Sequence, residues 1–360
     1  SPADGKVNSI EGFEGNSVKS LTFCDGTLVG GTDNGLVLMP DKREPHIFRH
    51  DSRNAFSIAS NVVWSVCADR LGNVWCGNES GISIIDYESP VRVYSLADIT
   101  GRSEGQQVYS ILRDRTGTLW IGGTNGVIMQ RPDGSTRWFT PGNGSDNLSH
   151  NRVRDIAESS QGDILVAGDG GINIYDHAGS KFRNHRFADR SNHLNANWAY
   201  GVLEDSADST LWIAGYLGGV FKEKVSRFRS EGFRHTADTV FASTDGGLPN
   251  DLIGQIIQDR QHNKWVLHFR DSALTRISAD GTSIDRIDIR TATGQEPTML
   301  CMGPSGDIWC GFYGGVARIA PSGTVSDTII RFPFGGADET VRAMAPVARE
   351  IWVATSSAVW

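Results

Sequence analysis

Acid–base chemistry needs titratable side chains held close together, and the sequence offers one short stretch of this kind. His268, Arg270 and Asp271 lie in the run HFRD at 268–271, and together they can supply the acid and base of a lyase. Charged residues are ordinary in turns, however. The nine histidines show no HExxH zinc spacing, and the chain has no GxSxG nucleophile motif. We therefore expect no catalytic residue, no metal site and no cofactor.

Cysteine chemistry is equally weakly indicated. The five cysteines, Cys24, Cys67, Cys76, Cys301 and Cys310, are an odd number and form no CxxC pair, so neither a zinc site nor a disulfide framework is predicted. Cys67 and Cys76 take the same places in a repeated unit as Cys301 and Cys310 take in another. We interpret them as small core residues.

Composition excludes several classes of partner. Lys and Arg number 34 against 42 Asp and Glu, a net charge of −8, and no block of like charge stands out. A basic face that follows phosphates is therefore not indicated, and we expect no nucleic acid partner. The longest apolar runs fall far short of the roughly 18 residues of a membrane span, and no leader opens the chain. We expect a soluble, already processed chain or a fragment of a longer protein.

Any binding residues must be positioned by a repeat that fills the chain. Aligned on the residue before a recurring x-Gly, the units are anchored at Val29, Trp75, Trp120, Leu165, Trp212, Trp265, Trp309 and Trp352. The last seven anchors are spaced by 45, 45, 47, 53, 44 and 43 residues. A period near 45 is typical of four-stranded propeller blades. Eight units account for nearly the whole chain.

Each unit predicts four short strands joined by tight turns. The best example is 108–139, where VYSILRD precedes a turn with Asp114 first and Gly117 last, followed by LWIGG, NGV and RWFT. Asp can cap its own turn, and Gly tolerates the positive φ that closes a hairpin. Trp120 is expected to be a wedge between neighbouring blades.

The two ends of the chain predict ring closure. The last unit stops at Trp360 without a fourth strand, and residues 5–13 read as a fourth strand with nothing before it. Pairing them would complete one blade and remove exposed sheet edges. We predict an all-β protein, a β-propeller of four-stranded blades in a single domain, 1–360. Eight blades are favoured, with seven as the alternative, and the N-terminal strand closes the ring.

The repeat resembles that of a known family. QVYSILRDRTGTLWIGGTNGV (107–127) and NVVWSVCADRLGNVWCGNESGI (61–82) are similar to the two-component regulator propeller repeat, and the likeness covers essentially the whole chain. The family implies a ligand-binding sensor region outside the cytoplasmic membrane of a bacterial hybrid histidine kinase or related signalling protein. It also implies a periplasmic or extracellular location, with the membrane reached only through parts absent here. A second resemblance, to virginiamycin B lyase-like propellers, covers one or two units around 303–323.

Ligand contacts are predicted on one face. In a propeller, the openings of the first strands and the turns after the second strands gather on one side. Aromatic rings stack on sugar C–H faces, and planar polar groups match hydroxyls, so this mixture suits a saccharide or other small molecule. The candidates are Trp64, Tyr109, Arg152, Arg154, Trp198, Tyr200, Tyr216, Arg270 and Tyr313.

These residues leave alternatives open. Trp64, Tyr109 and Tyr200 taken singly are better explained by packing between blades, and Trp198 is the best candidate for an exposed platform. The end of an insertion, residues 245–250, is expected to border the same face. A ligand-binding sensor is the favoured function. A lyase or glycan-cleaving propeller and a protein-interaction scaffold stay as alternatives, and a homodimer is compatible with the sequence.

Overall fold

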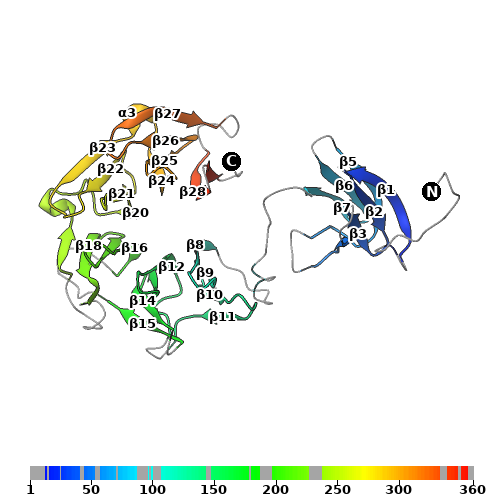
Figure 1. Ribbon diagram of the computed structural model, residues 1–360, viewed down its shortest axis with the longest axis horizontal. Coiled ribbons are helices and arrows are strands. Elements are labelled where there is room, and N and C mark those ends of the chain that lie inside the picture. The colour runs from blue at the N-terminus through cyan, green and yellow to red at the C-terminus, as the bar shows by residue number, and fades with distance from the viewer. Residues whose placement is uncertain are drawn as a thin grey trace. The chain divides into compact units, whose positions relative to one another are not determined.

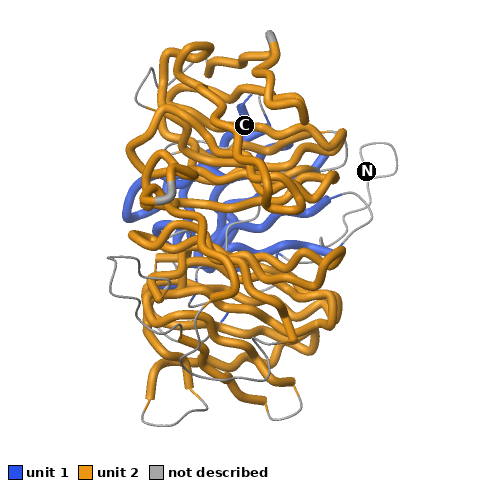
Figure 2. Tube along the Cα trace, turned by 90° about the vertical axis from the view of Figure 1, so that its left-hand side faces the viewer, with its two compact units in different colours: residues 1–105 blue, residues 106–360 orange. Residues whose placement is uncertain are grey.

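The regular secondary structure of the described residues consists almost entirely of antiparallel strands, which confirms the all-β prediction. The computed structural model describes residues 13, 16–24, 26–40, 44–52, 57–69, 72–86, 96, 99, 107–142, 147–177, 180–186, 197–226, 237–332, 339–347 and 350–355. Backbone contacts divide the chain into two compact units, Ser1–Gly105 and Gln106–Trp360 (Figure 2). Each is considered by itself.

The first unit contains two sheets. One has the order β1-β2-β3-β4 and the other β5-β6-β7. Their apolar residues, among them Val29, Leu36, Val63 and Val74, form one buried cluster. The strands are β1 (Val18–Cys24), β2 (Thr27–Thr32), β3 (Gly35–Met39), β4 (His46–Phe48), β5 (Val63–Ala68), β6 (Asn73–Asn78) and β7 (Gly81–Asp86).

Among its described residues, the second unit contains five four-stranded sheets and one pair of strands (Figure 1). Its strands are β8 (Val108–Arg113), β9 (Leu119–Gly123), β10 (Gly126–Gln130), β11 (Thr136–Phe139), β12 (Val153–Glu158), β13 (Ile164–Gly168), β14 (Gly171–Asp176), β15 (Lys181–His185), β16 (Ala199–Asp205), β17 (Thr210–Gly215), β18 (Gly219–Lys224), β19 (Thr239–Phe241), β20 (Ile253–Gln258), β21 (Lys264–His268), β22 (Ala273–Ile277), β23 (Ile284–Asp288), β24 (Pro297–Met302), β25 (Ile308–Phe312), β26 (Gly315–Ile319), β27 (Val325–Arg331), β28 (Val341–Val347) and β29 (Glu350–Thr355). The short helices η1 (Ser243–Asp245) and α3 (Arg290–Thr293) connect successive sheets.

Every four-stranded sheet has its strands in sequence order, each paired antiparallel to the next. This is the predicted arrangement of one meander per repeat. The turn after the first strand also has the predicted chemistry. Asp114 Oδ1 accepts hydrogen bonds from the backbone N–H of Thr116 at 2.9 Å and of Thr118 at 3.0 Å. Gly117 has a φ of 85°, a value that costs little without a Cβ.

In three repeats the tryptophan of the second strand is fully buried, as predicted, whereas Trp309 and Trp352 are half-buried and Trp75 is 41% exposed. Trp120 on β9 is fully buried in a cluster with Val153, Ile164 and Phe182 of the following sheet. Its ring meets the edge of Tyr175 at a centroid distance of 4.9 Å. Trp212 and Trp265 are likewise fully buried, and Leu165, which replaces Trp in its repeat, is 2% exposed.

The outcome is different for the predicted ring closure, for the single domain and for the cysteines. Residues 5–12 and 356–360 lie outside the described residues, so ring closure and the number of blades stay predictions, as does the single domain. All five cysteines are free. Four of them are buried, but the prediction was wrong for Cys67, which is exposed because its side chain alternates away from the buried Val66.

Candidate functional site: a cavity lined by repeated β-bulges

A β-bulge recurs at the start of the first strand of each sheet. In the second unit, pairing with the following strand shifts register between the first and third residues of each first strand. Such a bulge leaves one residue out of the ladder and re-aims its side chain. The residues at this second position are Tyr109, Arg154, Tyr200, Gly254, Thr298 and Arg342, and all six line one cavity.

The cavity lies within residues 106–360 and has a volume of about 910 Å³. Figure 1 shows the first strands β8, β12, β16, β20, β24 and β28 on the concave side of the arc that the sheets of this unit form. Consecutive first strands contact one another. Small-molecule sites in proteins measure roughly 300–1,000 Å³, so the cavity is large enough for such a ligand.

In β8, β12 and β20 the residue after the bulge, Ser110, Asp155 or Gln255, ties neighbouring first strands together. Asp155 Oδ2 accepts a hydrogen bond from the backbone N–H of Val202 at 3.1 Å, and its Oδ1 accepts from Ser110 Oγ at 3.3 Å. Gln255 makes two bonds to the backbone of Leu300, at 2.7 and 3.0 Å. Burial raises the pKa of the Asp155 carboxyl, and the N–H donors partly offset this effect. The polar groups next to the cavity are thus used to hold its framework.

One side of the cavity, which we call the stacked side, is formed by Tyr109, Arg154 and Tyr200. The Arg154 guanidinium lies 4.4 Å from the Tyr200 ring centroid and 5.3 Å from that of Tyr109. Arg154 Nε donates a hydrogen bond to Asp169 Oδ1 at 2.9 Å, and Arg154 Nη2 donates to Asp169 Oδ2 at 3.2 Å. Cation–π contact and a bidentate carboxylate pair both fix a planar guanidinium. The stacked side is therefore pre-organised.

Further aromatic rings support Tyr200. Tyr216 stacks on it at 4.9 Å with an interplanar angle of 20°, and Phe269 meets it edge-on at 5.8 Å. Trp198 leans on Tyr216 at 5.9 Å. Burial raises the pKa of the Tyr200 hydroxyl, opposed by the nearby Arg154. The phenol therefore stays protonated at neutral pH and can donate a hydrogen bond.

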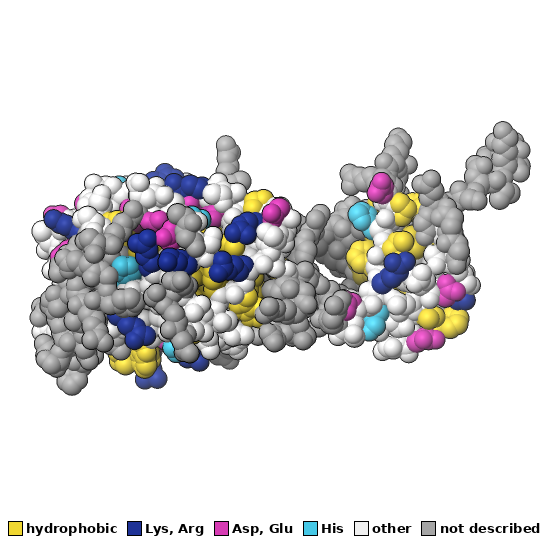
Figure 3. Space-filling view, turned by 90° about the horizontal axis from the view of Figure 1, so that it is seen from below, with side chains coloured by type: hydrophobic (Ala, Val, Ile, Leu, Met, Phe, Trp, Pro, Cys, Tyr) yellow, Lys and Arg dark blue, Asp and Glu magenta, His cyan; other side chains and the backbone are white. Residues whose placement is uncertain are grey.

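A second group of lining residues, which we call the open side, consists of Arg270, Glu296, Tyr313 and Arg342. Arg270 follows β21 in the turn to β22 and has a φ of 58°, a left-handed conformation that is uncommon outside glycine, asparagine and aspartate. On the face drawn in Figure 3, Lys and Arg side chains of the second unit lie beside hydrophobic ones.

The predicted residues are distributed unevenly around this cavity. Five of the nine line it: Tyr109, Arg154, Tyr200, Arg270 and Tyr313. Trp198 and Tyr216 lie behind Tyr200, and Arg152 lies 3.5 Å from Asp169. Trp64 belongs to the first unit, at the same bulge position in β5, where Lys19 Nζ is 5.3 Å from its ring. Whether any of them binds a ligand stays a prediction.

Among the lining residues that sequence reasoning did not name are Phe269, Glu296 and Arg342. Arg342 occupies the same repeat position as Tyr109 and Arg154, so aligning the second residue of each first strand would have found it. Of the insertion end, Asn250 Nδ2 lies 3.4 Å from the Phe269 carbonyl oxygen, but residues 246–250 do not line the cavity.

The HFRD turn does not bring an acid and a base together. His268 is 2% exposed and its Nε2 lies 2.9 Å from Thr275 Oγ1. Burial lowers the pKa of its ring to about 4, so the ring is neutral at pH 7. Asp271 is paired with Arg286 at 3.0 Å. In the part of the chain that the structure describes, no group of His, Cys, Asp and Glu side chains is arranged to hold a metal ion.

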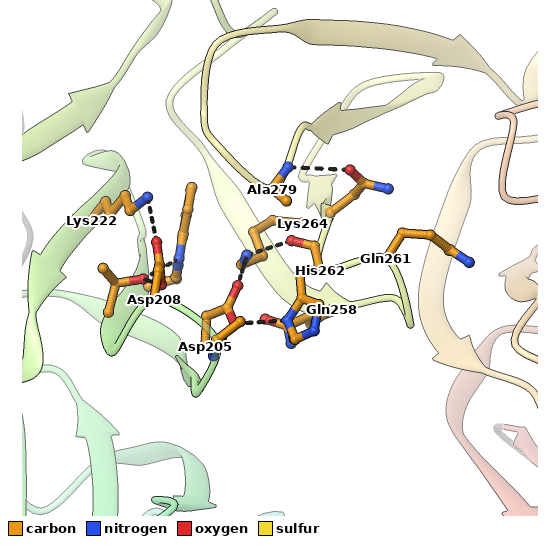
Figure 4. A network of polar contacts seen from close by, with 12 residues as sticks. Asp205, Asp208, Lys222, Gln258, Gln261, His262, Lys264 and Ala279 are labelled. Atoms are coloured by element: carbon orange, nitrogen blue, oxygen red, sulfur yellow. Dashed lines mark hydrogen bonds and ion pairs between the residues drawn. The ribbon is translucent and has the colours of Figure 1, made fainter.

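A separate polar cluster lies at the other end of the strands and holds two sheets together (Figure 4). Lys264 Nζ is fully buried and donates to Asp205 Oδ2 at 2.6 Å and to the His262 carbonyl oxygen at 2.6 Å. His262 Nδ1 lies 2.8 Å from Asp205 Oδ1. Burial raises the pKa of Asp205, but the hydrogen bonds from Lys264, Ala207 and His262 and the charge of Lys264 together outweigh it, and the net pKa is lowered.

Several known proteins are similar to this chain in sequence and architecture. Residues 103–125 match the family model described as two component regulator propeller. The whole chain is 34% identical to the extracellular domain of the putative hybrid two component system BT4673 from B. thetaiotaomicron, with a TM-score of 0.70, and covers 49% of that chain. The extracellular domain of the putative hybrid two component system BT3049 from the same organism is 18% identical over 95% of this chain and 44% of that chain. Its TM-score of 0.68 bears on the fold alone.

The lyase likeness is much weaker. Virginiamycin B lyase from Staphylococcus aureus is 12% identical, covers 97% of this chain and 95% of that chain, and has a TM-score of 0.37, too low for an argument about function. No curated protein matches the chain.

Fold and matches together define a β-propeller of the class found in extracellular sensor domains. The chain carries the two-component regulator propeller repeat, which confirms the resemblance seen in its sequence. A periplasmic or extracellular location is also confirmed by the similarity to the BT4673 extracellular domain. The chain spans about half the length of the extracellular domains it matches. None of its described helices is long and apolar enough to cross a membrane.

Proposed function

We propose that this chain is the ligand-recognition part of a bacterial sensor and that its cavity takes up a saccharide. The output is passed on by segments outside this chain. Similarity to the extracellular domain of a putative hybrid two component system supports the sensor role. The observation that carries the saccharide assignment is the stacked side, where aromatic faces and a fixed guanidinium occupy one wall.

A sugar needs both apolar and polar contacts. Its C–H faces pack on aromatic rings, and its hydroxyls need donors and acceptors held in fixed directions. Tyr109, Tyr200 and Phe269 supply rings along the cavity, and Arg154 and the Tyr200 hydroxyl supply donors. Because Arg154 is already held by Asp169, little side-chain entropy is lost on binding.

A lyase is not favoured by any contact in the cavity. The neutral, buried His268 lacks the exposure that a general base needs, and Asp271 is engaged with Arg286. The binding function therefore stands as the conclusion.

The test is a glycan array probed with the full chain, followed by calorimetry on each sugar that binds. Tyr200→Ala should weaken binding at least tenfold, since it removes the ring that contacts both Arg154 and Tyr216. Arg183→Ala is the control, because Arg183 lies on the outermost strand β15 with its side chain 64% exposed. If no glycan binds, or if Tyr200→Ala binds as well as the unaltered chain, the cavity is not a saccharide site.

A further inference from the structure

Among the described residues, the charged side chains that line the cavity have bonding partners on the stacked side, whereas those of the open side do not. On the stacked side, Arg154 is paired with Asp169, and the Asp155 oxygens accept bonds from Ser110 and Val202. Among the described contacts, Arg270, Glu296 and Arg342 of the open side have no ion pair and no side-chain hydrogen bond. Two guanidiniums and one carboxylate leave this side with a net positive charge.

Arg270 also occupies an unfavourable backbone position. Its φ of 58° is matched at the corresponding turns by Leu217, with 62°, and Gly314, with 85°. Glycine adopts this conformation without strain, whereas a side chain with a Cβ does not. Strained residues cluster at binding sites because their surroundings hold them in place. Here the strain puts a guanidinium on the cavity wall.

The Arg270 and Arg342 side chains are exposed and therefore available to a ligand. Arginine stays charged in proteins, so both add positive charge to the cavity wall. An oxyanion suits such a wall, because the guanidinium fork matches two oxygens of a carboxylate or sulfate with two parallel hydrogen bonds.

We propose that the open side is an anion subsite, in which Arg270 and Arg342 bind the acidic group of an acidic saccharide. This rests on the proposed function and narrows it: the sugar ring packs on the stacked side, and a carboxylate or sulfate ester faces the two arginines. Glu296 disfavours a second acidic group, since it would face a like charge.

The experiment compares oligosaccharides in matched pairs that differ only in one acidic group: a uronate against the neutral hexose, and a sulfated sugar against its unsulfated form. By calorimetry with the full chain, the acidic member should bind at least tenfold more tightly. Its affinity should fall as NaCl rises, because salt screens the charges. Arg270→Gln and Arg342→Gln should each reduce this affinity roughly tenfold or more and leave the neutral member unchanged. Arg183→Gln is the matched control.

A second pair of variants separates recognition from folding. Arg270→Gly relieves the left-handed strain, so its melting temperature should rise by roughly 2 to 4 °C while preference for the acidic sugar is lost. Leu217→Gly at the corresponding turn should give the same rise with binding intact. If Arg270→Gly melts lower, Arg270 is a structural residue and the proposal is wrong.

The remaining outcomes distinguish this proposal from the general one. Equal binding of acidic and neutral sugars overturns the anion subsite and leaves the saccharide cavity standing. If no sugar binds but inorganic sulfate binds and Arg270→Gln abolishes it, the anion subsite stands and the saccharide assignment falls. No binding of any acidic probe overturns the subsite.

Discussion

In the second unit, the two ends of the first hairpin of each sheet use their side chains differently. At the turn between the first two strands, the same bonds recur: the indole N–H of Trp120 donates to Asp114 at 2.8 Å, and that of Trp265 to Asp259 at 2.8 Å. At the other end, the bulge residue changes from Tyr109 to Arg154 and Tyr200 from one sheet to the next. The turn end, whose residues repeat, holds the sheets together. The bulge end, whose residues vary, lines the cavity.

The sheet that contains β16 lacks the bond between indole and Asp at its turn end, and the following sheet supplies partners for its Asp instead. One additional residue separates Asp205 from Trp212, so Trp212 donates instead to Thr210 Oγ1 at 3.0 Å. Asp205 binds Lys264 and His262 from the following sheet. The two ends therefore make opposite predictions: substitutions at the turn end should reduce stability without altering recognition, and substitutions at the bulge end should do the reverse.

The largest effect is expected for Trp120→Ala. This removes a fully buried ring, and truncations of this kind cost about 3 to 5 kcal/mol. Chemical denaturation should show this loss, while any protein that still folds keeps its ligand affinity. A melting temperature close to that of the unaltered chain would show that Trp120 is not a wedge between sheets.

An effect of the same order is expected for Asp205→Ala. It leaves Lys264, with a fully buried side chain, without its carboxylate, and removing one partner of a buried pair costs about 3 to 5 kcal/mol. The double variant Asp205→Ala/Lys264→Met should recover most of this loss, because no buried charge remains. If the double variant is no more stable than the single one, the pair is not the source of the cost.

Asp114→Asn should have a smaller and pH-dependent effect. Burial raises the pKa of Asp114, but hydrogen bonds from Thr116, Trp120 and Thr118 outweigh it, and the net pKa is lowered. A group with a depressed folded-state pKa stabilises the protein above its unfolded pKa of about 3.9 and loses this as pH falls through the folded value. The variant should therefore be less stable by about 1.5 to 3 kcal/mol at pH 7, with the difference shrinking below about pH 4.

A difference in the free energy of unfolding between wild type and Asp114→Asn that stays constant down to pH 2 would contradict this account of Asp114. The control is Asp133→Asn in the exposed turn before β11. Bonds from Ser135 also lower the pKa of Asp133, but solvent screens this exposed group, so the variant should alter the pH dependence less.

The repeated end was predictable from the sequence, whereas the cavity was predictable only in part. The Asp, Gly and Trp of a turn lie within six residues of one another along the chain, so their spacing can be recognised from the sequence without knowledge of the fold. Even the repeat that lacks the turn glycine follows the rule, since His262 adopts a φ of 64° at that place. Its ring also reaches Asp205, a contact 57 residues away in sequence that no local pattern indicates.

The cavity depends on register, which local patterns do not fix. Tyr109, Arg154 and Tyr200 were found because they follow the openings of clearly repeated strands. Arg342 was missed because its repeat lacks the Asp and Gly of the turn. The bulge directs Tyr200 to the cavity, whereas Trp198, two residues earlier, does not line it; its role as a platform for a ligand stays a prediction.

The smallest change in stability, and the sharpest test of the comparison, is expected for Tyr109→Leu at the bulge end. The Tyr109 side chain is 43% exposed, and substitutions at such sites usually change stability by no more than about 0.5 kcal/mol. Loss of an aromatic contact costs about 0.5 to 1.5 kcal/mol, so affinity for a glycan found on the array should fall roughly two- to tenfold. Tyr109→Phe, which keeps the ring and loses only the hydroxyl that donates to Gln107 at 3.0 Å, should bind nearly as well as wild type. A Tyr109→Leu protein that melts several degrees lower but binds normally would reverse the roles of the two ends, because a bulge residue would then be holding the sheets together.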